Sequence, residues 1–501
     1  MLVPGGSDSQ VGPLWSRAFD AAPDGRWRMR AVWLVGMTLL AALAMLLGGG
    51  RPVLLGLLGL LALAWVLHDP LIAVGPLVMF QIIWVFGAYA PGGVAALSPS
   101  KLSLALAGLG WIVWAWRERV APTYAPHQWG FGLFFATVLA GPFVSPAFDD
   151  AVVGIGKFGL MFLTYLLVAN LAVNRRGVTT VAAAITVTAC VAALLALFER
   201  LLPGVELDFE GAISLGAHTD DESLTGLAIK RVSGGLGDAN WFSYTMATTL
   251  PLCLYWFRAY TSGWVRSAAV CAAMLQFGGI VLSYTRTPLV GLAGALLFLV
   301  WQKRIALLPV VLGAVVALVS APAWLPAGFL DRFFSQEYIK EGSTPVRAEI
   351  FEMAVDLIRD RPILGYGFDQ FGPQFIERST SDMGWEWARR DRTGEEPAKR
   401  LRAHNLYLDV WVQGGIVALA GLVIGFGWLL RELWIVSRAA RDREADLALC
   451  LFAGLLSFYL CGMGGHSQEL KIFWVTAGLV AGLRRWVLSG YREPEHSART
   501  A

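Results

Sequence analysis

The chain has 501 residues, of which 56% are hydrophobic and 15% are charged, and its mean hydropathy is +0.57. A soluble domain carries about 25% charged residues, so this composition excludes an ordinary soluble globular protein. Disorder needs low hydrophobicity and high net charge, whereas the formal charge here is +3. The composition therefore predicts a polytopic membrane protein surrounded by lipid, with no nucleic-acid partner.

Apolar runs long enough to cross a bilayer, roughly 17–25 residues each, recur along the sequence. They predict an all-α fold with about 12–14 transmembrane helices and one large helical periplasmic loop. The predicted spans lie near 31–48, 52–67, 71–90, 102–116, 130–147, 151–173, 178–198, 239–257, 267–284, 287–301, 305–321, 405–430, 446–463 and 471–486.

The Lys and Arg residues of the loops favour one orientation of these spans. Twenty of them fall in the tails and alternate loops that lie in the cytoplasm if the N-terminus is cytoplasmic. The short turns on the other side hold four, which are Arg51, Lys101, Arg286 and Lys471. This bias predicts that both termini are cytoplasmic.

The spans and the segments between them divide the chain into five predicted regions. The segment 322–403 holds 12 Lys and Arg and 14 Asp and Glu together with helix signals, so we expect a folded external cap. The regions are a cytoplasmic tail at 1–30, a transmembrane bundle at 31–321 with an external loop at about 200–238, the periplasmic cap at 322–403, C-terminal transmembrane helices at 404–487 and a cytoplasmic tail at 488–501.

Arg286 is a cation on the predicted outer side, where the positive-inside rule disfavours it. It lies in Ser283-Tyr284-Thr285-Arg286-Thr287-Pro288, midway along an apolar stretch that allows two minimal spans joined by a tight turn. It is either an arginine that extends to the interface from a helix end or a residue that binds an anion.

Arg347 follows a predicted helix start, with Thr344 as N-cap and Pro345 at the first helical position. A cation in the first turn opposes the helix dipole. At helical spacing it shares a face with apolar residues, namely Ile350, Phe351, Ala354 and Ile358. Arg347 therefore either binds a phosphate group at the helix N-terminus or pairs with Glu349 or Glu352.

His404 opens the predicted span 405–430 directly after the cap, and Arg231 precedes the span 239–257 in a glycine-rich segment. A neutral imidazole at His404 could remove a proton from a hydroxyl, although a single histidine at a helix end can also be a simple interfacial residue. The glycine spacing around Arg231 does not match a phosphate-binding P-loop.

The remaining polar residues give weaker signals. The acidic clusters Asp149-Asp150 and Asp220-Asp221-Glu222 lack a supporting His or further carboxylate, so neither a metal nor a cofactor is expected. Lys157 lies inside the span 151–173 and should need a partner or a water-filled cavity. His466, in a short Gly-Gly-His-Ser turn, is predicted to be solvated.

Taken together, these segments resemble the O-antigen ligase and polymerase family of bacterial envelope membrane proteins. The resemblance covers roughly 225–425 and combines loose motifs in a fixed order around a large external loop. The motifs are Arg231, Gly235 and Asn240 before a span; Ser283-Tyr284-Thr285-Arg286 between two spans; Arg347 followed by Pro362-Ile363-Leu364-Gly365-Tyr366-Gly367; and His404-Asn405-Leu406-Tyr407-Leu408 with Gly414-Gly415 downstream.

The resemblance implies a glycosyltransferase of the bacterial inner membrane with its active site facing the periplasm and no cofactor. Its donor would be a glycan on undecaprenyl diphosphate, and its acceptor lipid A–core or a growing glycan. It implies catalytic roles for Arg286, Arg347 and His404, which would stabilise the leaving pyrophosphate without a metal and activate the acceptor hydroxyl. It implies substrate-binding roles for Arg231, Asn240 and Asn405.

Other functions remain open at this stage. Ligation to lipid A–core is favoured slightly over polymerisation of lipid-linked repeat units, since the two share their donor chemistry. A flippase or other transporter of lipid-linked glycans would place cations through the span interiors, whereas most unusual cations here lie on the outer side. A non-catalytic envelope scaffold would tolerate substitution of single Arg or His residues.

Overall fold

The computed structural model describes residues 62–83, 98–202, 229–308, 343–378 and 401–489, with short pieces at 206–207, 213–214, 219–220 and within 311–320. The predicted span 31–48, most of 52–67, about half of 305–321 and nearly all of both tails lie outside these residues. The division of the chain into five regions therefore stays a prediction.

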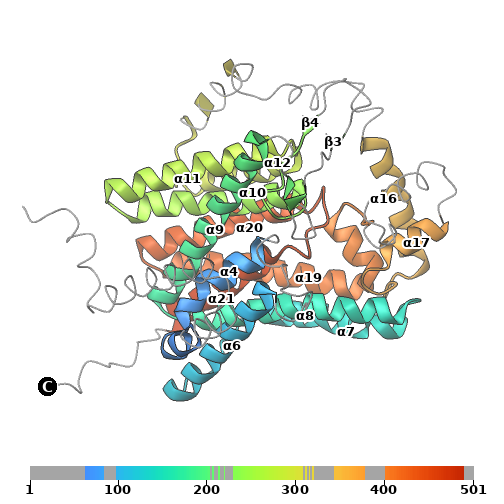
Figure 1. The fold of residues 1–501 in the computed structure, drawn as a ribbon, viewed down its shortest axis with the longest axis horizontal. Coiled ribbons are helices and arrows are strands. Elements are labelled where there is room, and N and C mark those ends of the chain that lie inside the picture. The colour runs from blue at the N-terminus through green and yellow to red at the C-terminus, as the bar shows by residue number, and fades with distance from the viewer. Residues whose placement is uncertain are drawn as a thin grey trace, which may run out of the picture.

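Long helices account for most of the described chain and form a bundle (Figure 1). The shorter ones are the 3-10 helix η1 (Pro70–Ala73), α4 (Val74–Ile82), α12 (Thr287–Trp301) and α17 (Phe371–Arg378). The longer ones are α6 (Pro99–Glu118), α7 (His127–Val144), α8 (Phe148–Leu171), α9 (Arg175–Leu201), α10 (Ala239–Ala259), α11 (Gly263–Leu282), α16 (Ser343–Asp360), α19 (Leu406–Ala439), α20 (Asp442–Cys461) and α21 (Lys471–Ser489).

Five of these helices, α8, α9, α11, α19 and α20, are long and apolar enough to cross a membrane. This confirms the predicted fold class of a polytopic helical membrane protein. The helices follow the predicted spans closely, but α19 continues to Ala439, beyond the predicted end at 430. In Figure 1 the cap helices α16 and α17 lie at one end of the bundle.

The predicted external loop at 200–238 contains short strands that an all-α prediction does not include. β1 (Glu206–Leu207) pairs antiparallel with β2 (Ile213–Ser214), so that Glu206 faces Ser214. β3 (Thr219–Asp220) pairs antiparallel with β4 (Ile229–Lys230), so that Thr219 faces Lys230. Each strand has two residues, a length too short to give a detectable alternating pattern in the sequence.

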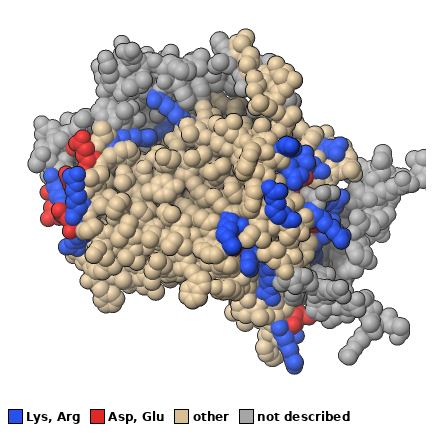
Figure 2. Space-filling view, turned by 180° about the vertical axis from the view of Figure 1, so that it is seen from behind, with Lys and Arg blue, Asp and Glu red and all other residues tan. Residues whose placement is uncertain are grey.

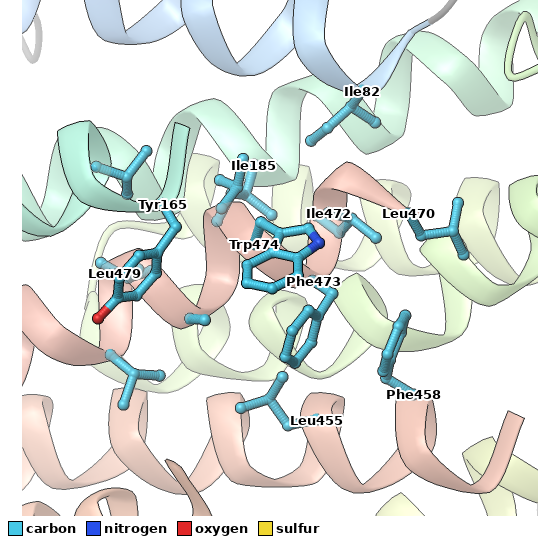
Figure 3. Packing of buried hydrophobic residues seen from close by; sticks show 14 of the residues in the cluster. Ile82, Tyr165, Ile185, Leu455, Phe458, Leu470, Ile472, Phe473, Trp474 and Leu479 are labelled. Atoms are coloured by element: carbon cyan, nitrogen blue, oxygen red, sulfur yellow. The ribbon is translucent and has the colours of Figure 1, made fainter. Parts of the chain in front are cut away.

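The bundle core is built around α21, whose Phe473 and Trp474 side chains are almost completely buried. Figure 3 shows Trp474 and Phe473 of α21 among aliphatic and aromatic side chains of neighbouring helices. The Phe473 ring stacks on Phe458 of α20 at 5.1 Å and meets Phe131 of α7 edge to face at 5.6 Å. These contacts join three helices that are far apart in the sequence.

Small residues allow α7 and α19 to pack backbone to backbone. A Cβ atom on Gly130 would come within 2.3 Å of the backbone nitrogen of Gly425, and one on Gly421 within 2.6 Å of that of Phe134. Gly421 and Gly425 form the Gly-x-x-x-Gly spacing that is common where membrane helices approach closely.

On one face of the molecule, most of the visible charged side chains lie toward its edges (Figure 2). Figure 2 shows a broad uncharged surface between two edges that carry Lys, Arg, Asp and Glu. At the end away from the cap, Arg258 and Arg304 both contact Asp446, at 3.1 and 2.8 Å. An uncharged band between charged ends is what a bilayer requires of a spanning protein.

Helix α19 is interrupted at Gly415, and the chain after α16 fills the interruption. Gly415 has φ 68° and ψ −174°, a conformation that side-chain-bearing residues rarely adopt. Three backbone hydrogen bonds then join the two segments, namely Tyr366 N to Val412 O at 3.0 Å, Gly367 N to Gln413 O at 2.8 Å and Ile416 N to Pro362 O at 2.8 Å. The Pro362–Gly367 motif and the Gly414-Gly415 pair are thus two sides of one contact.

We expect Gly415→Ala to destabilise the protein by more than about 2 kcal/mol, because φ is positive there and a Cβ atom would lie 1.9 Å from the carbonyl oxygen of Ile363. Gly427→Ala, on the same helix, meets no atom within 4 Å and is the matched control. Thermal unfolding in detergent measures both. Equal midpoints for the two variants would contradict the described packing.

Candidate active site

Four loops meet at the end of the bundle that carries the cap. They are the segment 231–238 before α10, the turn 283–286 between α11 and α12, the segment 401–405 before α19 and the loop 462–470 between α20 and α21. Together they carry four of the six residues that the sequence identified as site candidates, namely Arg231, Arg286, His404 and Asn405, while Asn240 lies in α10 and Arg347 in α16. Side-chain hydrogen bonds, rather than regular secondary structure, hold these loops against one another.

Arg231 joins the first loop to the second. Its Nε donates to the carbonyl oxygen of Ser283 at 3.1 Å, and its Nη2 donates to Asn240 Oδ1 at 3.1 Å and to Thr285 Oγ1 at 3.0 Å. Asp238 caps α10 by accepting from the backbone nitrogen of Asn240 at 2.7 Å. Asn240, predicted to bind substrate, therefore holds Arg231 in place through its Oδ1 atom.

Arg286 lies at the N-cap position of α12 and is half-buried. It follows Thr285, the residue that accepts from Arg231, so the two arginines belong to one group of loops. Tyr284 has φ 52° and its side chain is buried, which fixes the turn from inside. The tight turn predicted around Arg286 is therefore present.

Arg347 projects from the apolar side of α16. The predicted face is confirmed, because the side chains that share it with Arg347 are buried, namely Ile350, Ala354 and Ile358. Within the described part of the chain the half-buried guanidinium of Arg347 makes no hydrogen bond or ion pair, so the alternative of a partner in Glu349 or Glu352 is not supported. A half-buried cation without a partner favours an anionic ligand.

His404 has a left-handed backbone, with φ 47°, and a half-buried ring. The ring lies edge to face with that of His466, with 5.6 Å between the centroids. Burial and then the positive charge of Arg347 lower the pKa of His404 to about 4, against the opposing effect of Asp238. His404 is therefore neutral at physiological pH and can accept a proton.

A buried carboxylate fixes the segment that carries His404. Asp409 Oδ1 accepts from the backbone nitrogen of Ala403 at 3.0 Å, and Asp409 Oδ2 accepts from Gln413 Nε2 at 2.5 Å and from Gln468 Nε2. One carboxylate thus connects the 401–405 segment, the first turns of α19 and the 462–470 loop. The sequence analysis did not select Asp409, although a carboxylate five residues after His404 at the start of an apolar helix is an available signal.

Asn405 is the N-cap of α19. Its Oδ1 accepts from the backbone nitrogens of Tyr407 and Leu408 at 2.9 and 3.1 Å, and its Nδ2 donates to the carbonyl oxygen of Met463 at 3.0 Å. The side-chain amide of Asn405, predicted to bind substrate, thus makes hydrogen bonds to protein groups in this structure. Its contacts orient the residue directly before it, His404.

Lys157 reaches out of α8 to a network of ion pairs next to the site. Its Nζ lies 2.8 Å from Asp369 Oδ2, while Asp369 Oδ1 lies 2.5 Å from Nη2 of the buried Arg402. Arg402 also contacts Glu469 at 3.3 Å. Burial alone would raise the pKa of Asp369, but Arg402 and Lys157 lower it below its ordinary value. The partner that the sequence required for Lys157 is therefore a carboxylate of the cap.

His466 is the main correction to the sequence analysis, which predicted a solvated residue. The side chain is half-buried between Trp241 and His404, and its Nδ1 atom is buried. Trp241 Nε1 donates to the carbonyl oxygen of His466 at 3.0 Å. No periodicity or motif indicated this, because the residue follows two glycines in a short turn whose path depends on distant contacts.

The site combines cations with a neutral base. Arg231, Arg286 and Arg347 suit a ligand with concentrated negative charge, and His404 suits a hydroxyl that must lose a proton. Across the described ranges no group of three or more His, Cys, Asp or Glu side chains could hold a metal ion. The arrangement suits the departure of a phosphorylated leaving group and the activation of a hydroxyl nucleophile.

Comparison with known proteins gives two matches. Residues 271–423 match the family model described as O-Antigen ligase, a range that includes Arg286, Arg347 and His404. The O-antigen ligase of Pseudomonas aeruginosa is 27% identical over 196 residues, which cover 34% of this chain and 41% of that protein. The chain thus matches about two fifths of the length of this curated relative. Arg231 and His466 lie outside the range matched by the family model.

We expect Asp369→Asn to reduce stability by about 3 kcal/mol, since it removes the carboxylate that lies 2.5 Å from the buried Arg402, closer than Glu469 at 3.3 Å. Asp356→Asn, which removes an exposed pair with Arg359, should change stability by less than about 1 kcal/mol. Unfolding midpoints of both variants in the same detergent measure the difference, and similar values would contradict the role given to Asp369.

Proposed function

We propose that this chain is a member of the O-antigen ligase family and a glycosyltransferase of the bacterial inner membrane that moves a glycan from undecaprenyl diphosphate onto an acceptor hydroxyl. Lipid A–core is the favoured acceptor, because both comparisons are with O-antigen ligases. A polymerase that joins lipid-linked repeat units is the alternative. The observation that carries the proposal is the half-buried Arg347, which has no hydrogen-bond or ion-pair partner among the described residues and lies near the neutral His404.

A diphosphate-linked donor explains why the site carries positive charge. When the bond between the anomeric carbon and the phosphate oxygen breaks, the electron pair stays on the departing diphosphate, whose negative charge must be stabilised. Arg286 and Arg347, with Arg231 behind them, supply that stabilisation in place of a metal. Arg231 is held by Asn240 and Thr285, so its guanidinium needs no rearrangement when the donor binds.

The acceptor hydroxyl requires a base on the other side of the anomeric carbon. His404 accepts the hydroxyl proton as the oxygen forms the new glycosidic bond, and the diphosphate leaves from the opposite face. This displacement inverts the configuration of the anomeric carbon. The low pKa of His404 keeps the imidazole neutral and able to accept a proton before each turnover.

The proposed location of the site follows from the distribution of charge. The Lys- and Arg-rich loops favour a cytoplasmic location for both termini, and the loops that carry Arg286 and His404 belong to the opposite side. The site therefore faces the periplasm, where a finished lipid-linked glycan meets its acceptor.

A flippase or transporter is less well supported. Two ionisable side chains inside the helices have close partners, with Lys157 Nζ 2.8 Å from Asp369 Oδ2 and Glu432 Oε2 2.7 Å from His127 Nδ1. A path for a charged glycan through the bundle would require a succession of available polar groups. Arg347, a cation with no partner in the part of the chain that the structure describes, lies instead at the loop end.

The function is tested with a deletion strain complemented by wild-type or His404→Ala protein. A silver-stained gel of lipopolysaccharide is read together with a blot for undecaprenyl-linked glycan. If the protein is a ligase, the deletion strain contains unmodified core and accumulates lipid-linked polymer. Complementation with His404→Ala then does not restore the wild-type pattern. Core capped by a single repeat unit would instead identify a polymerase, and an unchanged pattern would exclude lipopolysaccharide as the product.

We expect Arg347→Ala to lower the transfer rate by about 100-fold or more while membrane insertion is unchanged, because a charge that stabilises the leaving group is lost. Arg359→Ala, on the same helix but 75% exposed in its side chain, is the matched control and should keep the wild-type rate. Transfer is measured in proteoliposomes at equal protein levels. Full activity of Arg347→Ala would overturn the assignment of the anion site.

The pH dependence of the rate should report His404. Its neutral form is the active one, so kcat/KM should stay level as pH falls and should drop through the pKa of His404, about 4, rather than near the ordinary value of 6.5. The charged or titratable groups that influence this ring are Arg347, Asp238 and His466. An acid limb with its midpoint near 6.5 would contradict the described environment of the ring.

A further inference from the structure

His466 is a half-buried titratable side chain that the mechanism above does not use. Its ring lies between two aromatic rings of the site, with 5.6 Å from its centroid to that of Trp241 and 5.6 Å to that of His404. The interplanar angles, 66° and 73°, are those of edge-to-face contacts. His466 is thus a direct neighbour of the proposed base.

The Nδ1 atom of His466 has no hydrogen-bond partner among the described residues, although it is buried. A buried polar nitrogen without a partner costs about 1–3 kcal/mol, so such atoms usually mark a missing ligand or water. A ligand that enters between the loops could supply the partner.

The loop around His466 is held in a fixed position by several contacts. Trp241 Nε1 donates to the carbonyl oxygen of His466 at 3.0 Å, and the Tyr244 hydroxyl donates to that of Gly464 at 3.3 Å. Gly465 lies so close to Tyr244 that a Cβ atom would come within 2.4 Å of the hydroxyl oxygen. The imidazole is therefore presented by a preorganised turn, as a binding residue requires.

The chemistry of the ring selects the class of ligand. Burial, followed by the proximity of His404 and Arg402, lowers the pKa of His466 well below its ordinary value, so the ring is neutral. A neutral imidazole offers one donor and one acceptor nitrogen, which matches a hydroxyl group better than a phosphate. The cations of the site already match the phosphates.

We propose that His466 binds a hydroxyl group of the acceptor glycan beside His404. This inference rests on the proposed transferase function and adds an acceptor-binding residue to it. A sugar hydroxyl can donate one hydrogen bond and accept two, so adjacent hydroxyls, or one hydroxyl, can bind both imidazoles at the same time. The two histidines then orient the nucleophile between them, while the arginines hold the donor.

The test compares His466→Phe with His466→Gln in the full-length protein in nanodiscs, with lipid A–core as the varied acceptor and undecaprenyl-linked glycan as the donor. His466→Phe should raise the acceptor KM by about tenfold, the loss of roughly one hydrogen bond, with the donor KM unchanged. His466→Gln keeps a hydrogen-bonding amide and should recover most of the loss. His68→Phe, an exposed histidine at the other end of the bundle, is the control and should change neither KM.

Binding without turnover separates this inference from the proposed function. Lipid A–core alone should raise the unfolding midpoint of the wild-type protein and of His68→Phe, but not of His466→Phe. Either of two results for His466→Phe would overturn the inference. One is an acceptor KM within about twofold of wild type, and the other is an equal rise in both KM values together with a lower unfolding midpoint. A different result would overturn the proposed function alone. In that case the wild-type protein binds lipid A–core but does not transfer glycan to it, and His466→Phe does not bind lipid A–core.

Discussion

The buried carboxylate of Asp409 is the contact on which the site depends. It accepts hydrogen bonds from the backbone of Ala403 and from the side chains of Gln413 and Gln468, and so it joins three segments that would otherwise be independent. A carboxylate at this depth is tolerated only because each oxygen has a donor. This arrangement holds His404 in a left-handed conformation that a free loop would leave.

The requirements of a bilayer explain why the site is built from loops at one end. Within the hydrocarbon, helices satisfy their own backbone groups, and close glycine contacts such as that between Gly130 and Gly425 leave little room for a ligand. Backbone N–H and C=O groups become available for other contacts only where helices begin, end or break. The interruption at Gly415 provides such a point inside a helix, and the Pro362–Gly367 segment uses it to attach the cap.

The sequence predicted the helices well, and it selected some of the residues that the structure places at the candidate site. Apolar runs mark α7 to α12 and α19 to α21 because a bilayer imposes length and composition on each span separately. Arg286 and Arg347 were found because a cation is costly where they lie. Asp369, Arg402 and His466 were missed, since their roles arise from contacts between segments that are distant in the sequence. The two-residue strands at 206–230 were missed because no periodicity exists at that length.

The central claim is that the four loops form one site for a lipid diphosphate, with the acceptor base beside it. A structure of the protein in nanodiscs with undecaprenyl diphosphate, determined by electron cryomicroscopy, tests it most directly. The account predicts both phosphates in contact with Arg286 and Arg347, near the ring of His404. Phosphate density at the opposite end, beside the Arg258 and Arg304 pair with Asp446, would contradict it.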